Sequence, residues 1–400
     1  MKIPELLAPA GNMEKLKTAL LYGADAVYLG GGHSLRARAG SFTGEKLTSA
    51  VRLAHGMGKK AYVTVNVFAH NRDLDAIARH LEELAAAGVD GIIAADPGVI
   101  RLARSYAPRV LLHLSTQANV SNRESALFYE DLGVKRINLA RELSLAEIAE
   151  VRQALTCEIE VFVHGALCIS YSGRCLLSAA MTGRQANLGD CAHPCRYRYR
   201  LVEEKRPGEY FPIDEDDRGT YIMNSRDLCL IDRLPELAEI GVDSVKIEGR
   251  MKSAYYVGAV VRGYREGLDR IAAGRDGFTD IRAELDLVGT RGYTENFFNN
   301  PPGPADLLPE SPRAQARSEP VGIVSKTNGT CEIEVRNPIE RGDEIEYIGP
   351  GFVKSRHRIS GIIIGGEAAE RANPGLPAGL ELSPPPADWP AGALLRRIIA

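Results

Sequence analysis

The chain has 400 residues, 44% of them hydrophobic and 25% charged, a composition typical of folded globular proteins rather than disordered ones. Its formal net charge of −3 excludes a chain-wide attraction to nucleic acid or membrane surfaces, so RNA binding would need a local basic patch. No window reaches about 18 consecutive apolar residues, and the N-terminus lacks a signal-peptide pattern, so we expect a cytoplasmic protein with no membrane contact.

Short apolar runs alternate with amphipathic stretches over roughly the first 274 residues. Eight runs predict strands: Leu6–Pro9, Ala26–Gly30, Ala61–Val67, Gly91–Ala95, Val110–Gln117, Arg136–Ala140, Ile159–Gly165 and Ser244–Gly249. The intervening stretches predict helices, among them Asn12–Tyr22, Leu74–Ala87, Pro97–Tyr106, Arg123–Leu132, Leu145–Leu155 and Leu234–Ile240, with Ala254–Ala273 as the last. This alternation predicts an α/β fold, a (β/α)8 TIM-like barrel over residues 1–299, with an open α/β sheet as the alternative.

Two segments depart from this alternation. A cysteine-rich insertion of about residues 168–220 follows the seventh predicted strand. The proline-rich residues 300–318 predict a linker, and residues 319–400 predict a small all-β domain, a β-barrel. Its expected strands are Val321–Ser325, Thr330–Val335, Glu344–Ile348 and Arg358–Ile364.

Four cysteines of the insertion form a metal-ligand set: Cys168, Cys175, Cys191 and Cys195. Four thiolates suit an iron–sulfur cluster, most simply [4Fe–4S], or a structural zinc ion. Six residues separate the first pair, which fits a zinc knuckle poorly and favours iron–sulfur. Cys229 is a substitute for the fourth ligand, His193 is a further alternative, and plain buried thiols are the alternative to any metal site. Chemistry in TIM barrels lies at the carboxyl ends of the strands, so we expect the cluster beside the reaction centre.

Polar residues near the ends of the predicted strands are the candidate site residues. We expect catalytic roles for His113, Gln117, Glu160, His164, Lys246 and Glu248, and substrate binding by Asn66, Ser115 and Arg250. Alternation along a strand places His113, Ser115 and Gln117 on one face, directed into the barrel mouth. Lys246 and Glu248, on one inward face of the last predicted strand, can bind an anion or relay protons, but they can equally form an ion pair that only fixes the barrel.

Two groups of arginines complete the candidate set. Arg36 and Arg38 lie in the loop after the second strand, where guanidinium groups could capture a carboxylate or phosphate. Arg196 and Arg198 alternate with tyrosines directly after Cys195, a pattern suited to RNA phosphates and unpaired bases. The alternatives are solvated loop arginines and a hairpin edge over buried tyrosines.

The segment from Glu160 to Ser178 resembles the signature of the U32 "peptidase" family. Further similar segments are Glu5–Asn12, Gly23–Tyr28, Tyr221–Asp227, Val245–Arg250 and Arg291–Thr294. Within the family, the chain most resembles the tRNA 5-hydroxyuridine hydroxylation proteins. That resemblance implies a tRNA uridine hydroxylase that modifies the wobble uridine without O2, with prephenate or a similar small anion as the oxygen donor.

Two other functions stay open at this point. The family name suggests a peptidase of the collagenase-like type, although no Ser-His-Asp set or His-Glu-x-x-His motif is evident in the sequence. The other is a non-catalytic RNA-binding or assembly factor whose cluster is structural. A protein partner that delivers electrons or the cluster is a further open expectation.

Overall fold

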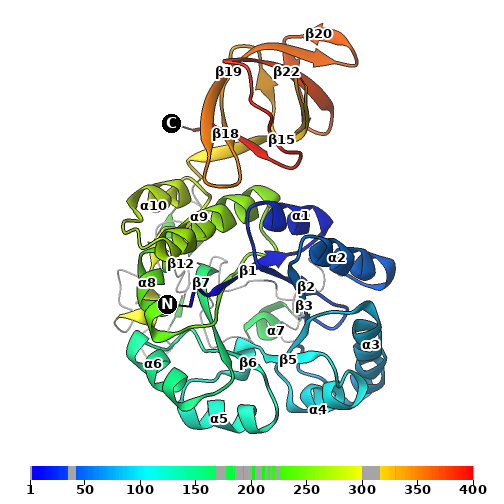
Figure 1. The fold of residues 1–400 in the computed structure, drawn as a ribbon, viewed down its shortest axis with the longest axis vertical. Coiled ribbons are helices and arrows are strands. Elements are labelled where there is room, and N and C mark those ends of the chain that lie inside the picture. The colour runs from blue at the N-terminus through cyan, green and yellow to red at the C-terminus, as the bar shows by residue number, and fades with distance from the viewer. Residues whose placement is uncertain are drawn as a thin grey trace. The chain divides into compact units, whose positions relative to one another are not determined.

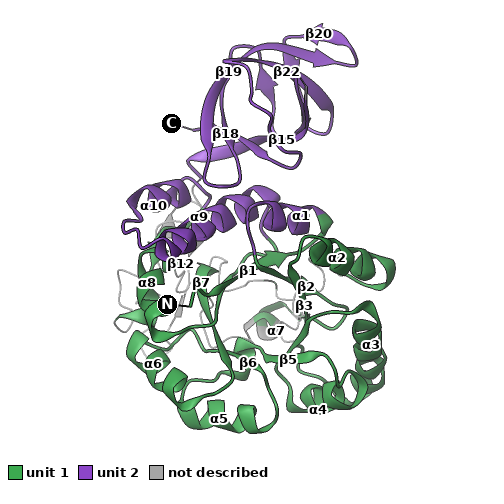
Figure 2. Cartoon of the chain, viewed as in Figure 1, with its two compact units in different colours: residues 1–13, 25–251, 290–314 green, residues 14–24, 252–289, 315–400 purple. Residues whose placement is uncertain are grey.

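The computed structural model describes residues 2–34, 42–167, 177–182, 184, 192, 201–202, 210–211, 215–216, 219–220, 226–299, 316–328 and 330–399. The chain divides into two compact units (Figure 2), one of residues 1–13, 25–251 and 290–314, the other of residues 14–24, 252–289 and 315–400. The predicted linker falls almost entirely outside the described residues, so that domain boundary stays a prediction. None of the helices in the described part of the chain has the length and apolar character that a membrane span needs.

Eight parallel strands form a closed ring in the first unit (Figure 1). They are β1 (Glu5–Ala10), β2 (Ala26–Gly30), β3 (Lys60–Val65), β4 (Gly91–Ala94), β5 (Leu111–Leu114), β6 (Arg136–Asn138), β7 (Glu158–Ala166) and β13 (Ser244–Ile247). Each strand pairs with the next, and β13 pairs with both β7 and β1, which closes the barrel. The predicted TIM-like barrel is confirmed, with all eight strands at the predicted places.

Helices alternate with these strands along the chain. They are α1 (Met13–Leu21), α2 (Gly44–Gly56), α3 (Leu74–Ala87), α4 (Pro97–Tyr106), α5 (Arg123–Asp131), α6 (Leu145–Ala154), α8 (Leu234–Ile240) and α9 (Ala254–Ala272). Capping residues determine where several of these helices begin and end. The Asp96 carboxylate accepts a hydrogen bond from the Val99 amide at 3.1 Å at the start of α4, and Gly88 ends α3 in the left-handed conformation, with φ at 74°.

Two short strands extend the barrel sheet beyond β7. Strand β12 (Asp227–Cys229) pairs antiparallel with the end of β7, and β14 (Tyr293–Thr294) pairs parallel with β12. A buried ion pair of 2.5 Å between Asp227 and Arg291 joins the segments that carry them. Gly165 in β7 has φ at 111°, and a Cβ there would lie 2.6 Å from the Glu248 carbonyl oxygen. The close approach of these two segments therefore requires glycine.

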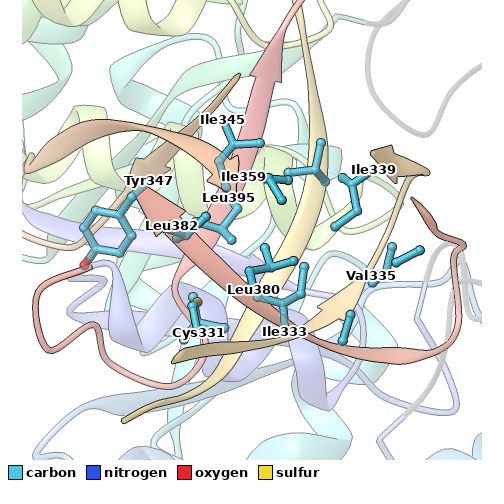
Figure 3. Packing of buried hydrophobic residues seen from close by; sticks show 14 of the residues in the cluster. Cys331, Ile333, Val335, Ile339, Ile345, Tyr347, Ile359, Leu380, Leu382 and Leu395 are labelled. Carbon is cyan, nitrogen blue, oxygen red and sulfur yellow. The ribbon is translucent and has the colours of Figure 1, made fainter. Parts of the chain in front are cut away.

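The second unit contains an antiparallel β-sheet that closes on itself. Its strands are β15 (Ser318–Asn328), β16 (Thr330–Val335), β18 (Glu344–Ile348), β19 (Lys354–Ile364), β20 (Glu367–Ala369), β22 (Pro377–Ser383) and β23 (Leu394–Ile398). Pairing of β18 with both β23 and β19 completes the closure. Figure 3 shows the core of this sheet, to which Ile333, Leu380, Leu395 and Tyr347 belong. The predicted all-β domain is confirmed.

The same unit includes α9 and α10 (Thr279–Asp286), which ion pairs connect to the sheet. Arg396 in β23 lies 2.9 Å from Glu284 in α10 and 2.7 Å from Glu346 in β18. Arg262 in α9 lies 3.2 Å from Glu284, and its Nε donates to the Gly349 carbonyl oxygen at 3.0 Å. Polar contacts thus fasten the C-terminal sheet to helices that precede the predicted linker in the sequence.

Candidate active site at the carboxyl ends of the barrel strands

An apolar cluster from β1 to β4 occupies part of the barrel interior. Its members are Leu7, Ala26, Tyr28, Tyr62 and Ile93. Polar side chains from the other strands meet this cluster: the His113 ring lies 4.6 Å from that of Tyr62, and the Lys246 Nζ lies 4.7 Å from the Tyr28 ring. Interior residues recur at every second position, as the pleat of a strand requires.

Glu160 and Lys246, both predicted as catalytic, form a buried ion pair. The Lys246 Nζ lies 2.7 Å from Glu160 Oε1, and the side chains are 4% and 3% exposed. Burial lowers the pKa of Lys246, and the Glu160 carboxylate acts against that shift. Lys246 thus has its acidic partner within the barrel, which agrees with a structural role for this lysine, but the partner is Glu160 on the neighbouring strand and not Glu248 as in the predicted alternative.

Arg136, which the sequence did not single out, extends this pair toward the amino ends of the strands. One of its nitrogens lies 2.6 Å from Glu5, another 2.6 Å from Glu158, and the first is also 3.5 Å from Glu160. Burial would lower the pKa of Arg136, but the carboxylates of Glu160 and Glu5 raise it. The guanidinium is 3% exposed and is the shared partner of three acidic residues.

Asn66, Ser115 and Gln117 come together beyond the carboxyl ends of β3 and β5. The Ser115 hydroxyl lies 3.3 Å from Gln117 Oε1 and 3.4 Å from Asn66 Nδ2, and Asn66 also donates to Gln117 Oε1. The predicted strand Val110–Gln117 is too long, since β5 ends at Leu114. Ser115 then caps a 3-10 turn, Thr116–Ala118, so a turn and not strand alternation places Gln117 beside Asn66.

The buried polar atoms with no hydrogen-bond partner among the described residues include His113 Nδ1, Gln117 Nε2 and Asn138 Oδ1. Their side chains belong to residues that are 3%, 3% and 2% exposed. An unsatisfied buried donor or acceptor costs about 1–3 kcal/mol, so Gln117 after the end of β5 and Asn138 at the end of β6 favour a polar ligand at the carboxyl ends of these strands. Asn138 was missed, although it lies two residues after the inward-facing Arg136.

We expect His113 to make the protein more sensitive to acid. Burial, followed by the charges of Arg136 and Lys246, lowers the pKa of His113 well below 6.5. Below about pH 6.5 this histidine is protonated in the unfolded chain but stays neutral in the folded chain. The free energy of unfolding therefore falls as the pH falls, by up to about 1.4 kcal/mol per pH unit. Denaturant titrations from pH 7 to 5 should show a steeper loss in the wild type than in His113→Gln. The control is His55→Gln, at an exposed site, which should lose stability with pH as the wild type does. Equal losses in the wild type and in His113→Gln would contradict this prediction.

Arg250 and His164 lie at the carboxyl ends of neighbouring strands. One Arg250 nitrogen lies 3.0 Å from Thr64 Oγ1 and 3.5 Å from Ser34 Oγ, in a residue that is 7% exposed. The buried His164 ring lies 5.2 Å from that of Tyr293, and the backbone amide of the half-buried Glu248 donates to the His164 carbonyl oxygen at 2.8 Å. The described candidates of β3, β5, β7 and β13 thus lie on these barrel strands or directly after them.

The remaining candidates lie outside the described residues: Arg36, Arg38, Cys168, Cys175, Cys191, Cys195, Arg196 and Arg198. Within the described ranges, no group of three or more His, Cys, Asp or Glu side chains could hold a metal ion. Cys229 is buried on β12, opposite His164 in the strand register. Whether Cys195 or Cys229 is the fourth ligand therefore stays a prediction.

One contact within the insertion bears on the cysteine set. The Ala192 amide donates to Ser178 Oγ at 3.0 Å, and both residues are buried. Ser178 follows Cys175 by three residues and lies in α7 (Leu177–Thr182), whereas Ala192 directly follows Cys191. In Figure 1, α7 projects within the ring of strands. Two distant parts of the insertion, each next to a predicted ligand, are thus joined by a hydrogen bond.

Known proteins resemble this chain over nearly its full length. Residues 11–307 match peptidase family U32, and residues 317–396 match the C-terminal domain of that family. "tRNA hydroxylation protein P1" of Bacillus subtilis is 41% identical over 90% of this chain and 87% of its own. "tRNA hydroxylation protein P" of Escherichia coli is 38% identical over 87% and 86%. The "23S rRNA 5-hydroxycytidine C2501 synthase" of Escherichia coli is 35% identical over 86% of this chain and 52% of its own.

Proposed function

The chain belongs to peptidase family U32, and from this membership and its barrel interior we propose that it is an iron–sulfur-dependent tRNA hydroxylase. The reaction would convert the wobble uridine to 5-hydroxyuridine without O2. Relatives named for tRNA and rRNA hydroxylation support RNA as the substrate class. The structural observation that carries the proposal is the pair of buried polar atoms, Gln117 Nε2 and Asn138 Oδ1, whose hydrogen bonds are unmade among the described residues at the carboxyl ends of the strands.

These atoms have the chemistry needed to bind a pyrimidine base. The Gln117 amide offers a donor and Asn138 an acceptor, and the uracil edge presents oxygens on either side of an N–H group. Asn66 and Ser115 hold the Gln117 carbonyl oxygen, which leaves its amide nitrogen for the base. A wobble uridine lies in a single-stranded loop, where a base can leave its stack at small cost and enter such a pocket.

The cysteine set fits an iron–sulfur cluster by ligand number and type. The contact between Ser178 and Ala192 supports the convergence of the parts that carry Cys175 and Cys191. When bound, the cluster would supply electron transfer at the barrel mouth. Prephenate is the oxygen donor that we propose, and its carboxylates would be suited to Arg250, with Arg36 and Arg38 as further candidates.

A peptidase is the second candidate function, because of the family name. One contact of the C-terminal sheet resembles part of a serine-protease triad. In the C-terminal sheet, Ser355 Oγ lies 2.7 Å from His357 Nε2. The other ring nitrogen of His357 lies 2.7 Å from the Pro384 carbonyl oxygen, not from a carboxylate. A carbonyl can orient the ring but carries no charge to stabilise an imidazolium, so this pair lacks the third member of a catalytic triad.

Complementation would test the proposed function. In a bacterial strain that lacks its own tRNA hydroxylation proteins, the wild-type chain should restore 5-hydroxyuridine, measured by mass spectrometry of tRNA nucleosides. Gln117→Ala should reduce the restored level at least tenfold, because it removes the base-facing amide and its contacts to Asn66 and Ser115. The matched control is Gln153→Ala on the exposed side of α6. Failure of the wild type to restore the nucleoside would overturn the proposal.

A further inference from the structure

A pocket opens at the opposite end of β5 from the candidate active site. Its volume is about 220 Å³, and it lies among α4, the start of β5 and the segment that leads into β6. Three basic side chains line it: Arg104, Arg109 and Lys135. Its floor is apolar and includes Ile92, Ala103 and Leu112.

The three cations are exposed and have no side-chain partner among the described residues, and no Asp or Glu lines the pocket. Helix α4 has no acidic residue and carries Arg101 one turn before Arg104. Arg136, the residue directly after Lys135, instead contacts three carboxylates. Positive charge is thus concentrated without compensation around one concave site, in a chain whose net charge is −3.

We infer that this pocket binds a phosphate group, and that the phosphate belongs to the RNA substrate. Guanidinium and ammonium groups are the side chains that recognise phosphate, and the apolar floor can receive an attached sugar or base. A pocket of about 220 Å³ is small beside typical ligand sites of about 300–1,000 Å³, which suits one phosphate with part of its nucleotide. RNA as the source rests on the proposed function, whereas the phosphate chemistry does not.

The position of the pocket determines which part of the RNA would occupy it. The four residues of β5 span about 13 Å and separate Leu111 at the pocket from Ser115 at the barrel mouth. A single nucleotide therefore cannot reach both the pocket and the barrel mouth. The pocket therefore holds a phosphate remote from the modified base, and it adds affinity without choosing the base.

The test replaces the three basic side chains of the pocket with glutamine, which removes their charge but keeps a polar side chain at each position. The variant R104Q/R109Q/K135Q is compared with K46Q/R52Q/R79Q, which removes three exposed cations of α2 and α3 that do not line the pocket. Binding of labelled tRNA is measured by fluorescence anisotropy from 50 to 200 mM salt. We expect the pocket variant to bind roughly tenfold more weakly, with a salt slope lower by about two, and the control to change less than threefold.

A second readout separates the two sources of phosphate. Inorganic phosphate, titrated into the wild type and followed by 31P NMR, should show binding that the pocket variant lacks and the control retains. Loss of phosphate binding with unchanged tRNA affinity would overturn RNA as the source and assign the pocket to a free phosphate compound. Equal effects of the two triple variants on both readouts would overturn the site. Absence of tRNA binding by the wild type would overturn the proposed function instead.

Discussion

Replacing Cys191 with alanine is expected to remove the proposed iron–sulfur cluster and abolish the proposed uridine hydroxylation. Three thiolates cannot complete a four-cysteine site, and Cys191 precedes the residue whose amide bonds to Ser178. After anaerobic purification, we expect about four irons and four sulfides per wild-type chain and nearly none in the variant. The visible absorption of the cluster should disappear together with the iron.

Cys229→Ala is the matched control, because Cys229 is the substitute for the fourth ligand and lies on β12. Retention of iron in Cys229→Ala and its loss in Cys195→Ala would assign the fourth position to Cys195. The reverse result would assign it to Cys229. Zinc without labile sulfide in the wild type would contradict the cluster, and would make the insertion a structural metal site.

Arg136→Met should cost about 3–5 kcal/mol in the free energy of unfolding of the barrel. The substitution keeps much of the side-chain volume but leaves Glu5, Glu158 and Glu160 without their shared partner. Glu160 would keep Lys246, whereas Glu5 would keep the exposed Lys60 at 3.3 Å and the Tyr62 hydroxyl at 2.9 Å. Denaturant unfolding followed by circular dichroism would measure the loss.

The matched control is Arg233→Met, which removes a more exposed arginine of the same unit. Arg233 pairs with Glu295 at 3.0 Å and with Glu236 at 3.1 Å, but its side chain is 32% exposed. Water can replace these partners, so we expect a loss below about 1 kcal/mol. Similar losses in both variants would mean that burial of the Arg136 network contributes little to the stability of the barrel.

The sequence located the barrel because its physical signals are strong and local. Apolar runs mark buried parallel strands, and polar starts such as Asp96 and glycine ends such as Gly88 mark helix boundaries. The fifth strand was predicted too long because the alternation of His113, Ser115 and Gln117 continues by coincidence into a turn. Periodicity cannot distinguish a strand residue from the first residues of a 3-10 turn.

Side-chain partners were the part of the site that the sequence could not predict. The sequence allowed either a catalytic or a structural role for Lys246. Only the structure shows that its Nζ lies 2.7 Å from Glu160 Oε1. Arg136 and Asn138 were missed because they lie in a strand of only three residues, too short to show an alternating pattern. Their partners come from other strands, and only the closed barrel brings them together.

The ion pairs of the second unit bear on how the C-terminal domain can be exchanged between proteins. Glu284 in α10 has three cationic partners, and two of them, Lys354 and Arg396, come from the β-sheet. Removal of the β-sheet would leave Glu284 without Lys354 and Arg396, and Arg262 without the Gly349 and Val353 carbonyl oxygens, at a cost in stability. We therefore expect transplantation of the sheet to require the matching side chains of α9 and α10 as well.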